Sequence, residues 1–536
     1  MPLLPALLAG VHLAGLLLFL NPRLPLTVGS LASAGLVYGL LLAPVSLATH
    51  LAVARFRGVP PRRLLPWSVT AVALAGALGD WVNASHYSLY LPAGINLQLL
   101  KTALWLSAGA LLMFYTALLH TSHRRRYGVR SRLFLVLVAL GTVYAMFDRR
   151  TNFRPLVSDP PRLVTTAREG SPRLAVVGLS TATLDAVLPL AEQGKLPFFA
   201  TFLESGARAR LGSLAPTRPS ALWATLATGR WPFRHGLEAE RLHSVPWLRG
   251  SDLRLLPVAI GFEHWGLPGA RTRPVAARDR EVSPLWTTLR ALGWPAAALG
   301  FSAALDGLAG AAEPSPAGVS PAERELEALG LPALARALGA DRRRLAQARQ
   351  QLARADGPEA LFVRLDGLES ASIASFGGFA AAQFEGDRSG RVRRAADALA
   401  AYYGGLDGEL AELWGALAEP RLLVVVSPYG IEAPTDLGRI LLDLADRPRL
   451  GGSVEGGPDG LLLARGDGVR RGVQVPGASI ADAVPTLLYA LGLPIARDLD
   501  GKVLAVAFEP ALLQRRPLTF VPSYEGLVAT AALSAP

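Results

Sequence analysis

The chain of 536 residues contains no cysteine, and only eight of its residues are histidines. The absence of cysteine excludes disulfide bonds and thiolate metal sites, while it leaves the cellular compartment open. Histidine is also unevenly placed, because none follows His264. Composition alone therefore excludes an imidazole ligand from the second half of the chain.

Acidic side chains are nearly missing from the first 154 residues, which hold Asp80 and Asp148 beside fourteen lysines and arginines. That segment accounts for the whole formal net charge of +12, so residues 155–536 are neutral overall. A nucleic-acid-binding protein concentrates positive charge on its folded domain. The charge distribution therefore argues against a nucleic-acid partner.

The same segment is rich in long apolar runs. Five of them precede residue 150, at about residues 3–20, 25–54, 65–83, 98–119 and 132–147. A spanning helix needs roughly 20 apolar residues, and the longer runs meet this length. The fifth run is short, the second contains Pro44, and the first lacks the basic residues of a signal peptide. Buried helices of a soluble domain are the alternative, but we predict a five-helix transmembrane domain over residues 1–150.

Arginines between the apolar runs predict the orientation in the membrane. Four of them separate the second run from the third, and five lie between the fourth and the fifth. Because such residues mark the cytoplasmic side, the N-terminus is expected there and the C-terminal domain on the extracytoplasmic, periplasmic side. Arg149, Arg150 and Arg154 follow the last run and argue the other way. Charges within membrane spans mark transport pathways, and we expect Lys101 to be the only clear one here. A transporter function therefore has little support.

The remainder has the pattern of an α/β domain. The stretches "RLAVVGL", "EALFVRLDG" and "RLLVVVSPYG" read as buried strands, and "PLWTTLRALG" and "ALGADRRRLAQARQQLARA" read as helices between them. Such alternation predicts a mostly parallel sheet with helices on both faces. We place a linker at 151–171, the domain at 172–525 and a tail at 526–536. In such folds ligands bind beyond the carboxyl ends of the strands.

Much of this domain resembles a known family. "VVGLSTATLDAVLPLAEQGKLPFFATFLESG" and the following "TGRWPFRHG", then "LFVRLDGLE", "VVVSPYGIE", "PDGLLLARGDG" and "RRPLTFVPSYEG" resemble, in order, the type I phosphodiesterase/nucleotide pyrophosphatase family of the alkaline phosphatase superfamily. Membrane helices before such a domain are similar to those of the superfamily's lipid phosphotransferases. The resemblance implies an alkaline-phosphatase-like fold. It also implies two metal ions, usually zinc, and a Ser or Thr nucleophile.

The first half of that domain departs from the family pattern. Ser180 stands where the resemblance implies the first aspartate ligand, directly after the "GL" of the first strand. Pro219 stands at the nucleophile position. Ser220, one residue later, is the best candidate nucleophile, and Thr217 is a weaker one. His235 lies in a turn where the resemblance implies a structural role.

The second half departs further. Glu369 and Ile373 stand where the resemblance implies an Asp and a His ligand, and Pro428 and Tyr429 replace another Asp–His pair. The last histidine falls at Gly456 or, with a gap, at Glu455. Glutamate can bind a metal, but isoleucine cannot. We therefore expect no two-zinc site and no other cofactor.

Two functions follow as hypotheses. The first is a pseudoenzyme that serves as a binding or structural subunit, with membrane or periplasmic proteins as partners, or an anionic or glycan ligand in the old cleft. The alternative is an active phosphodiesterase or lipid head-group phosphotransferase that uses Ser220, Glu369, Asp366 or Glu455. A new site at His243 and His264 lacks supporting carboxylates beyond Glu240 and Glu263, and Arg342, Arg343 and Arg344 are expected to form a solvated helix face.

Overall fold

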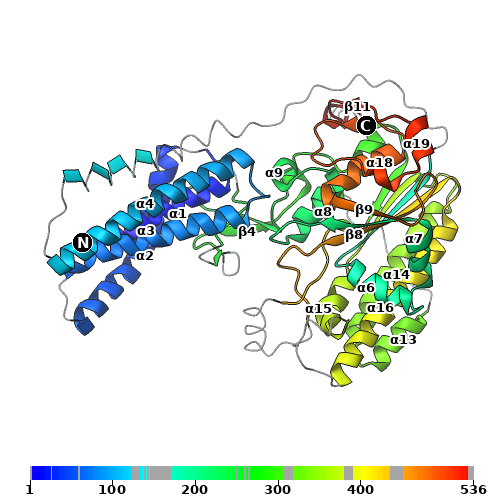
Figure 1. The fold of residues 1–536 in the computed structure, drawn as a ribbon, viewed down its shortest axis with the longest axis horizontal. Coiled ribbons are helices and arrows are strands. Elements are labelled where there is room, and N and C mark those ends of the chain that lie inside the picture. Colours follow the sequence, from blue (N-terminus) through cyan, green and yellow to red (C-terminus); the bar gives the residue numbers. More distant parts are fainter. Residues whose placement is uncertain are drawn as a thin grey trace. The chain divides into compact units, whose positions relative to one another are not determined.

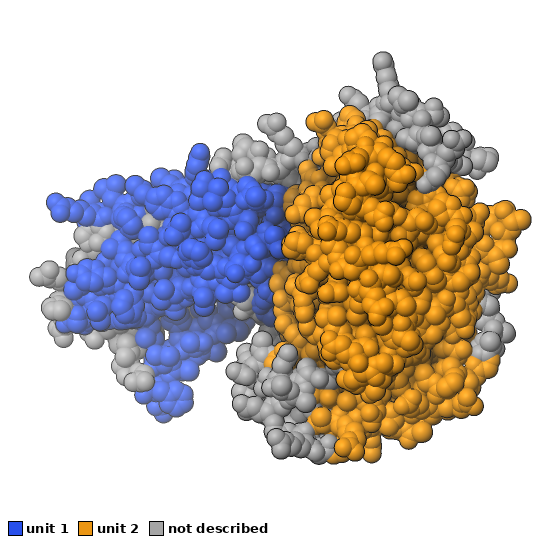
Figure 2. Space-filling model, turned by 45° about the vertical axis from the view of Figure 1, so that its right-hand side comes forward, with its two compact units in different colours: residues 1–156, 238–275 blue, residues 157–237, 276–536 orange. Residues whose placement is uncertain are grey.

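A computed structural model gives the fold. It describes residues 3–25, 27–57, 61–123, 171–248, 250, 252–258, 261–262, 266–306, 318–379, 390–434 and 451–528, and a few positions between 129 and 144. The chain forms two compact units, one of residues 1–156 and 238–275 and the other of residues 157–237 and 276–536 (Figure 2).

Unit 1 contains the predicted membrane helices. Four described helices are long and apolar enough to cross a membrane, namely α1 (Leu3–Leu20), α2 (Val28–Arg57), α3 (Pro61–His86) and α4 (Ala93–His123) (Figure 1). They match the first four predicted runs. The fifth run, 132–147, and the linker lie largely outside the described residues, so a fifth span remains a prediction.

Glycines allow α1 and α2 to pack closely. A Cβ atom on Gly10 would lie 2.2 Å from the backbone nitrogen of Gly39, and one on Gly35 would lie 2.8 Å from Val11. Small residues at such contacts let membrane helices approach, because lipid provides no hydrophobic drive for helix association. The pair therefore depends on backbone proximity at these positions.

Besides Lys101, a second ionisable residue, Asp80, lies within a candidate membrane span. Asp80 lies inside α3 and is 1% exposed. One of its carboxylate oxygens lies 3.3 Å from Nε2 of His12 in α1. The expectation that Lys101 is the only clear charge within a span was therefore wrong, because pairing with His12 lets a carboxylate remain in an apolar helix interface.

Residues 238–275 form part of unit 1, which the sequence did not predict. Their β3 (Arg241–Ser244) and β4 (Arg271–Pro274) pair in antiparallel fashion. Polar side chains near helix ends hold the stretch between them. Asn21 accepts hydrogen bonds from the backbone nitrogens of Arg254 (2.6 Å) and Leu255 (3.1 Å), and Asn83 accepts one from Val258 (3.0 Å). These contacts tie the segment to the end of α1 and the end of α3.

Unit 2 is built on a seven-stranded sheet with the order β5-β6-β1-β7-β8-β2-β9. β8 runs antiparallel to both its neighbours, and the other pairs are parallel. The predicted mostly parallel sheet is thus confirmed, as are the three quoted strands. The strands are β1 (Arg173–Leu179), β2 (Ala207–Gly212), β5 (Ala296–Leu299), β6 (Ala360–Leu365), β7 (Arg421–Ser427), β8 (Gly460–Gly466) and β9 (Val473–Ser479), with a small parallel pair of β10 (Ile495–Ala496) and β11 (Phe520–Val521).

Helices cover both faces of the sheet (Figure 1). One face carries α6 (Leu184–Glu192), α7 (Pro197–Ser205), α13 (Pro321–Ala328), α14 (Pro332–Leu352), α15 (Gly367–Phe379) and α16 (Gly390–Ala416). The other carries α8 (Pro219–Thr228), α11 (Leu285–Ala291) and α18 (Ala483–Ala490). Shorter helices are α9 (Pro232–His235), α12 (Ala303–Asp306) and α19 (Pro510–Arg515), with 3-10 turns at Ala277–Asp279, Ile480–Asp482 and Ala505–Ala507.

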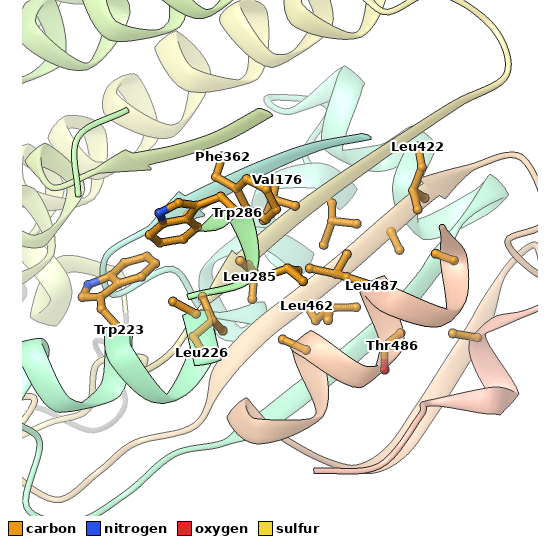
Figure 3. A pocket seen from close by; sticks show the side chains of 18 of the residues that line it. Val176, Trp223, Leu226, Leu285, Trp286, Phe362, Leu422, Leu462, Thr486 and Leu487 are labelled. Carbon is orange, nitrogen blue, oxygen red and sulfur yellow. The ribbon is translucent and has the colours of Figure 1, made fainter. Parts of the chain in front are cut away.

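Alternate strand residues supply the two faces, as the pleat requires. Val177 and Val363 point into the large core beneath α14 and α16, whereas Val176 and Phe362 line an apolar cavity of about 40 Å³ on the other face. Trp223 and Trp286 close one end of this cavity (Figure 3). Its lining is apolar apart from Thr486, so it offers packing space and no group for catalysis.

Candidate functional site

Three neighbouring parallel strands bring the predicted site positions to one edge of the sheet. β1 lies between β6 and β7, with Gly178 opposite both Arg364 and Val426. The residues that follow these strands therefore meet at the carboxyl edge, where ligands bind in open α/β sheets. Ser180, Asp366 and Tyr429 come from the three strand ends.

Ser180 is fully buried, and its polar groups form hydrogen bonds within the protein. Its backbone nitrogen donates to the carbonyl of Leu365 (3.1 Å), and its hydroxyl donates to Oδ1 of Asp366 (3.0 Å). Thr181, which follows, has a φ of 67°. That conformation is strained for a β-branched residue and is held only where the surroundings enforce it. The turn after β1 is thus held in place by hydrogen bonds within the protein.

The positive charge at this edge comes from an arginine. Nε of Arg364 donates to Oδ1 of Asp366 (2.8 Å), the same oxygen that accepts from Ser180. The guanidinium also stacks over the Trp223 ring, 4.8 Å from its centroid. Arg364 lies in β6 and Asp366 directly follows that strand, so the two residues of the pair are close in the sequence. The Arg364 guanidinium therefore pairs with the Asp366 carboxylate, which is the type of group that binds a metal ion.

Tyr429 and Glu369 form a second internal pair. The tyrosine hydroxyl donates to Oε2 of Glu369 (3.0 Å), and the ring is fully buried. Burial, followed by the nearby Glu369 charge, raises the pKa of the Tyr429 hydroxyl. The hydroxyl therefore stays a neutral donor near pH 7. Tyr429 thus combines a buried ring with a hydrogen bond to a carboxylate.

Pro428, Ile373 and Gly456 offer no metal-binding side chain. Ile373 is 42% exposed, and its carbonyl accepts from the backbone nitrogen of Gly452 (3.0 Å). The nitrogen of Gly456 donates to Oε1 of Glu432 (3.1 Å). A Cβ atom at Gly456 would lie 2.1 Å from that oxygen, so a larger residue does not fit there without movement.

The candidate nucleophiles lie around the start of α8. Pro219 is the first residue of that helix, a position that suits proline because no N–H is needed there. Ser220 is half-buried in the same turn. The backbone nitrogen of Thr217 donates to the carbonyl of Glu455 (3.4 Å), which brings two predicted site segments together. The Thr217 hydroxyl is buried and has no hydrogen-bond partner among the described residues.

A two-metal site does not fit these residues. Within the described part of the chain, no group of three or more His, Asp and Glu side chains is placed to hold a metal ion. The two carboxylates nearest the strand ends, Asp366 and Glu369, already accept from protein donors. Closely spaced dications require several anionic ligands, and the described residues at this edge form no such group.

His235 has the structural surroundings that the resemblance implied. His235 is fully buried, with Nε2 3.1 Å from the Thr225 hydroxyl and Nδ1 accepting from the nitrogen of Leu237 (3.1 Å). This is the expected structural role. His243 lies in β3 of unit 1, whereas His264 lies outside the described residues.

The arginines of α14 are less solvated than predicted. Arg342 pairs with Glu323 (3.0 Å) and Glu409 (2.8 Å), and Arg344 donates to the carbonyl of Arg364 (3.0 Å). The expectation of a solvated face was wrong for these two side chains, because α13 and α16 pack beside α14 and bring acidic partners. A local sequence pattern does not reveal neighbours from other helices.

Asp341 is a buried carboxylate that the sequence analysis missed. It is 2% exposed, and it accepts from the Tyr402 hydroxyl (2.9 Å) and the nitrogen of Gly367 (3.4 Å). Burial, opposed by the hydrogen bond from Tyr402, raises the pKa of Asp341 to about 6. A Cβ atom at Gly367 would lie 2.0 Å from the Tyr402 oxygen, so glycine is required there. No sequence motif around Asp341 indicates that this carboxylate is buried.

Comparison with known proteins gives distant likenesses. No protein-family model and no curated protein matches the chain. Matching solved structures include murine ectonucleotide pyrophosphatase/phosphodiesterase 5 (14% identity, 60% of this chain and 95% of that chain, TM-score 0.37). They also include its human counterpart (13%, 66% and 100%, 0.37) and phosphonoacetate hydrolase from Sinorhizobium meliloti (12%, 63% and 99%, 0.37). The fold described above rests on strand order and pairing, not on these values.

Proposed function

We propose that the protein is a membrane-anchored, phosphodiesterase-like pseudoenzyme that works as a binding or structural subunit. One observation carries this proposal: Asp366 and Glu369 at the carboxyl edge accept hydrogen bonds from Ser180, Arg364 and Tyr429. The family resemblance implies metal ligands at this edge. Donors from the protein already occupy one oxygen of each of these carboxylates. We infer that the pair does not hold metal ions, and that the domain lacks the electrostatic stabilisation that metals provide to phosphoryl transfer.

We also propose the extracytoplasmic side for the C-terminal domain. In support, Asn21 and Asn83 bind residues 254–258 at the C-terminal ends of α1 and α3. Arg55 and Arg57 lie at the C-terminal end of α2, away from the end that follows α1. Residues 254–258 lie within the 238–275 stretch of unit 1, which the chain joins to residues 237 and 276 of unit 2. The segment is therefore expected on the side away from the arginines, which is the extracytoplasmic side under the positive-inside rule.

The alternative is an enzyme with a reorganised site. The buried, unpartnered Thr217 hydroxyl and the strained Thr181 favour it, because strain and unsatisfied polar groups concentrate at functional sites. Ser220, at the start of α8, would be the nucleophile. This hypothesis requires a metal bound by oxygen ligands or a metal-free displacement.

Metal content of the full-length protein in detergent tests the proposal. The protein is loaded with zinc, washed, and measured by mass spectrometry, and hydrolysis of a phosphodiester is assayed on the same sample. We expect no zinc above background and no hydrolysis. Two equivalents of zinc per chain, or hydrolysis lost in both Ser220→Ala and Thr217→Val but kept in Ser213→Ala, would overturn the pseudoenzyme.

Partner identification is the complementary test. Cross-linking the protein in its native membrane, followed by purification, is expected to recover the same membrane or extracytoplasmic protein in stoichiometric amount. A Tyr429→Ala variant removes a buried side chain at the carboxyl edge and distinguishes binding there from binding elsewhere. Recovery of the protein alone, from wild type and variant, would contradict a subunit role.

A further inference from the structure

A large cleft lies at the opposite edge of the unit 2 sheet. β7 begins at Arg421 and the antiparallel β8 ends at Gly466, so this is the amino edge of the parallel strands. The cleft has a volume of about 830 Å³, which is within the range of small-molecule sites. Seven residues of strand separate it from the carboxyl edge by about 20 Å.

Guanidinium groups dominate the lining of this cleft, which we call the arginine cleft. It is lined by five arginines and one tryptophan, namely Arg421, Arg465, Arg471, Arg515, Arg516 and Trp414. The acidic residues of the lining are Glu419, Asp467 and Glu509. Positive charge is therefore in excess, although residues 155–536 as a whole are neutral.

Two of these arginines share one tryptophan. The guanidinium carbons of Arg421 and Arg465 lie 4.1 and 4.7 Å from the Trp414 ring centroid. Arg465 donates to the Thr201 hydroxyl (2.6 Å) and has no ion pair among the described residues. Burial, and then the charge of Arg421, lower the pKa of Arg465. Arg421 forms an ion pair with Glu419 (3.3 Å), whose side chain is 77% exposed, and its guanidinium also donates to the Trp414 carbonyl (2.9 Å).

The walls of the cleft are fixed by backbone contacts. The nitrogen of Arg421 donates to Oδ2 of Asp467 (2.7 Å), and the nitrogen of Asp467 donates to the Arg421 carbonyl (2.9 Å). Gly466 has a φ of 144°, and a Cβ atom there would lie 2.1 Å from that carbonyl. The arginines are therefore presented by a rigid turn, which lowers the entropic cost of binding.

We propose that the arginine cleft binds a phosphate-bearing small anion, with phosphate oxygens placed between Arg421 and Arg465. Guanidinium groups match the paired oxygens of phosphate, and an anion relieves the repulsion between the two arginines. The three acidic residues of the lining disfavour a long polyanion such as nucleic acid. The ligand is either a soluble phosphorylated molecule or a phospholipid head group. This site is separate from the carboxyl edge and stands whether or not the domain is a pseudoenzyme.

Calorimetric titration of the full-length protein in detergent tests this proposal. The probes are inorganic phosphate and glycerol 3-phosphate for a soluble ligand, and dihexanoyl phosphatidic acid for a head group. We expect saturable binding of at least one probe, which weakens at least tenfold in Arg465→Gln. The matched control is Arg470→Gln, which removes the same charge from an exposed neighbour outside the lining. It is expected to change the affinity less than twofold.

The outcomes separate the two sources and the failure of the proposal. Binding of phosphate or glycerol 3-phosphate assigns a soluble ligand, and binding of the lipid alone assigns a head group. Arg515→Gln, at the exposed rim, guards against misfolding of Arg465→Gln and is expected to weaken binding about threefold. No saturable binding by any probe overturns the proposal. Equal losses in Arg465→Gln and Arg470→Gln also overturn it, because they indicate only general surface charge.

Discussion

Tyr429 and Glu369 lie sixty positions apart in the chain, yet their side chains meet at a distance of 3.0 Å. Ser180 and Asp366 meet in the same way across 186 positions. The sequence identifies Ser180, Glu369 and Tyr429 as departures from the pattern that the resemblance implies, and Asp366 only as a residue that the enzyme alternative could use. It does not reveal that these side chains form hydrogen bonds with one another, because that depends on which strands are neighbours. At the residue scale, part-buried hydrogen bonds link these positions at the carboxyl edge of the sheet.

The contribution of the Tyr429 hydroxyl can be measured directly. In Tyr429→Phe the carboxylate of Glu369 loses a donor, so we expect the free energy of unfolding to fall by about 1–2 kcal/mol. Glu369→Gln keeps an acceptor oxygen and is expected to cost less. Thermal unfolding followed by intrinsic fluorescence provides the measurement. Equal stability of wild type and Tyr429→Phe would show that the bond contributes nothing.

Asp341 predicts a pH dependence of stability. Because its folded pKa, about 6, lies above the unfolded value of 3.8, its stabilising contribution is full below about pH 4 and is lost as pH rises through 6. At pH 7.5 the ionised carboxylate costs on the order of 3 kcal/mol relative to the protonated form. Asp341→Asn cannot ionise, so its stability relative to wild type is expected to increase between pH 4.5 and 7.5.

The measurement for Asp341 is the difference in unfolding temperature between the two proteins at each pH. Other carboxylates with shifted pKa values, such as Asp407 and Asp185, are common to both proteins and cancel in the difference. A difference that does not change with pH would contradict the assignment.

At the scale of elements, helices bring together partners that no local pattern links. α16 supplies Asp407, whose carboxylate accepts from the backbone nitrogens of Phe198 (3.0 Å) and Phe199 (2.7 Å) at the start of α7. α3 supplies Asp80, which lies beside His12 of α1. Apolar runs predicted α1 and α3, whereas α16 was not predicted. Their cross-helix polar partners depend on packing, which periodicity leaves open.

The His12–Asp80 pair is expected to stabilise the α1–α3 contact. Asp80→Leu leaves His12 without its partner in an apolar interface, and His12→Leu leaves Asp80 in the same position. Each single variant is expected to lower the unfolding temperature in detergent, because an unpaired buried polar group costs about 1–3 kcal/mol. The double variant restores apolar packing and is expected to recover part of the loss. Additive losses in the double variant would exclude an interaction between the two.

For the whole molecule, the sidedness of the membrane unit is the testable property. The chain has no cysteine, so single cysteines can be introduced without a background. A maleimide that does not cross membranes is expected to label Ser88→Cys and Lys195→Cys in cells with a permeable outer layer, and to leave Phe56→Cys unlabelled until lysis. All three positions are exposed. Labelling of Phe56→Cys alone would reverse the proposed orientation.

The sequence by itself determined the properties that depend on local composition and period. Apolar runs predicted four described helices, near-continuous apolar runs ending in turn residues predicted β1, β6 and β7, and the absence of histidine after His264 ruled out imidazole ligands at the later family positions. Only the tertiary structure decided which distant groups meet. It joined residues 254–258 to α1 and α3, paired Ser180 with Asp366, and placed Arg421 and Arg465 on one tryptophan. The physical reason is that periodicity records whether a face is buried, whereas hydrogen bonds and charge pairs depend on strand order and helix packing.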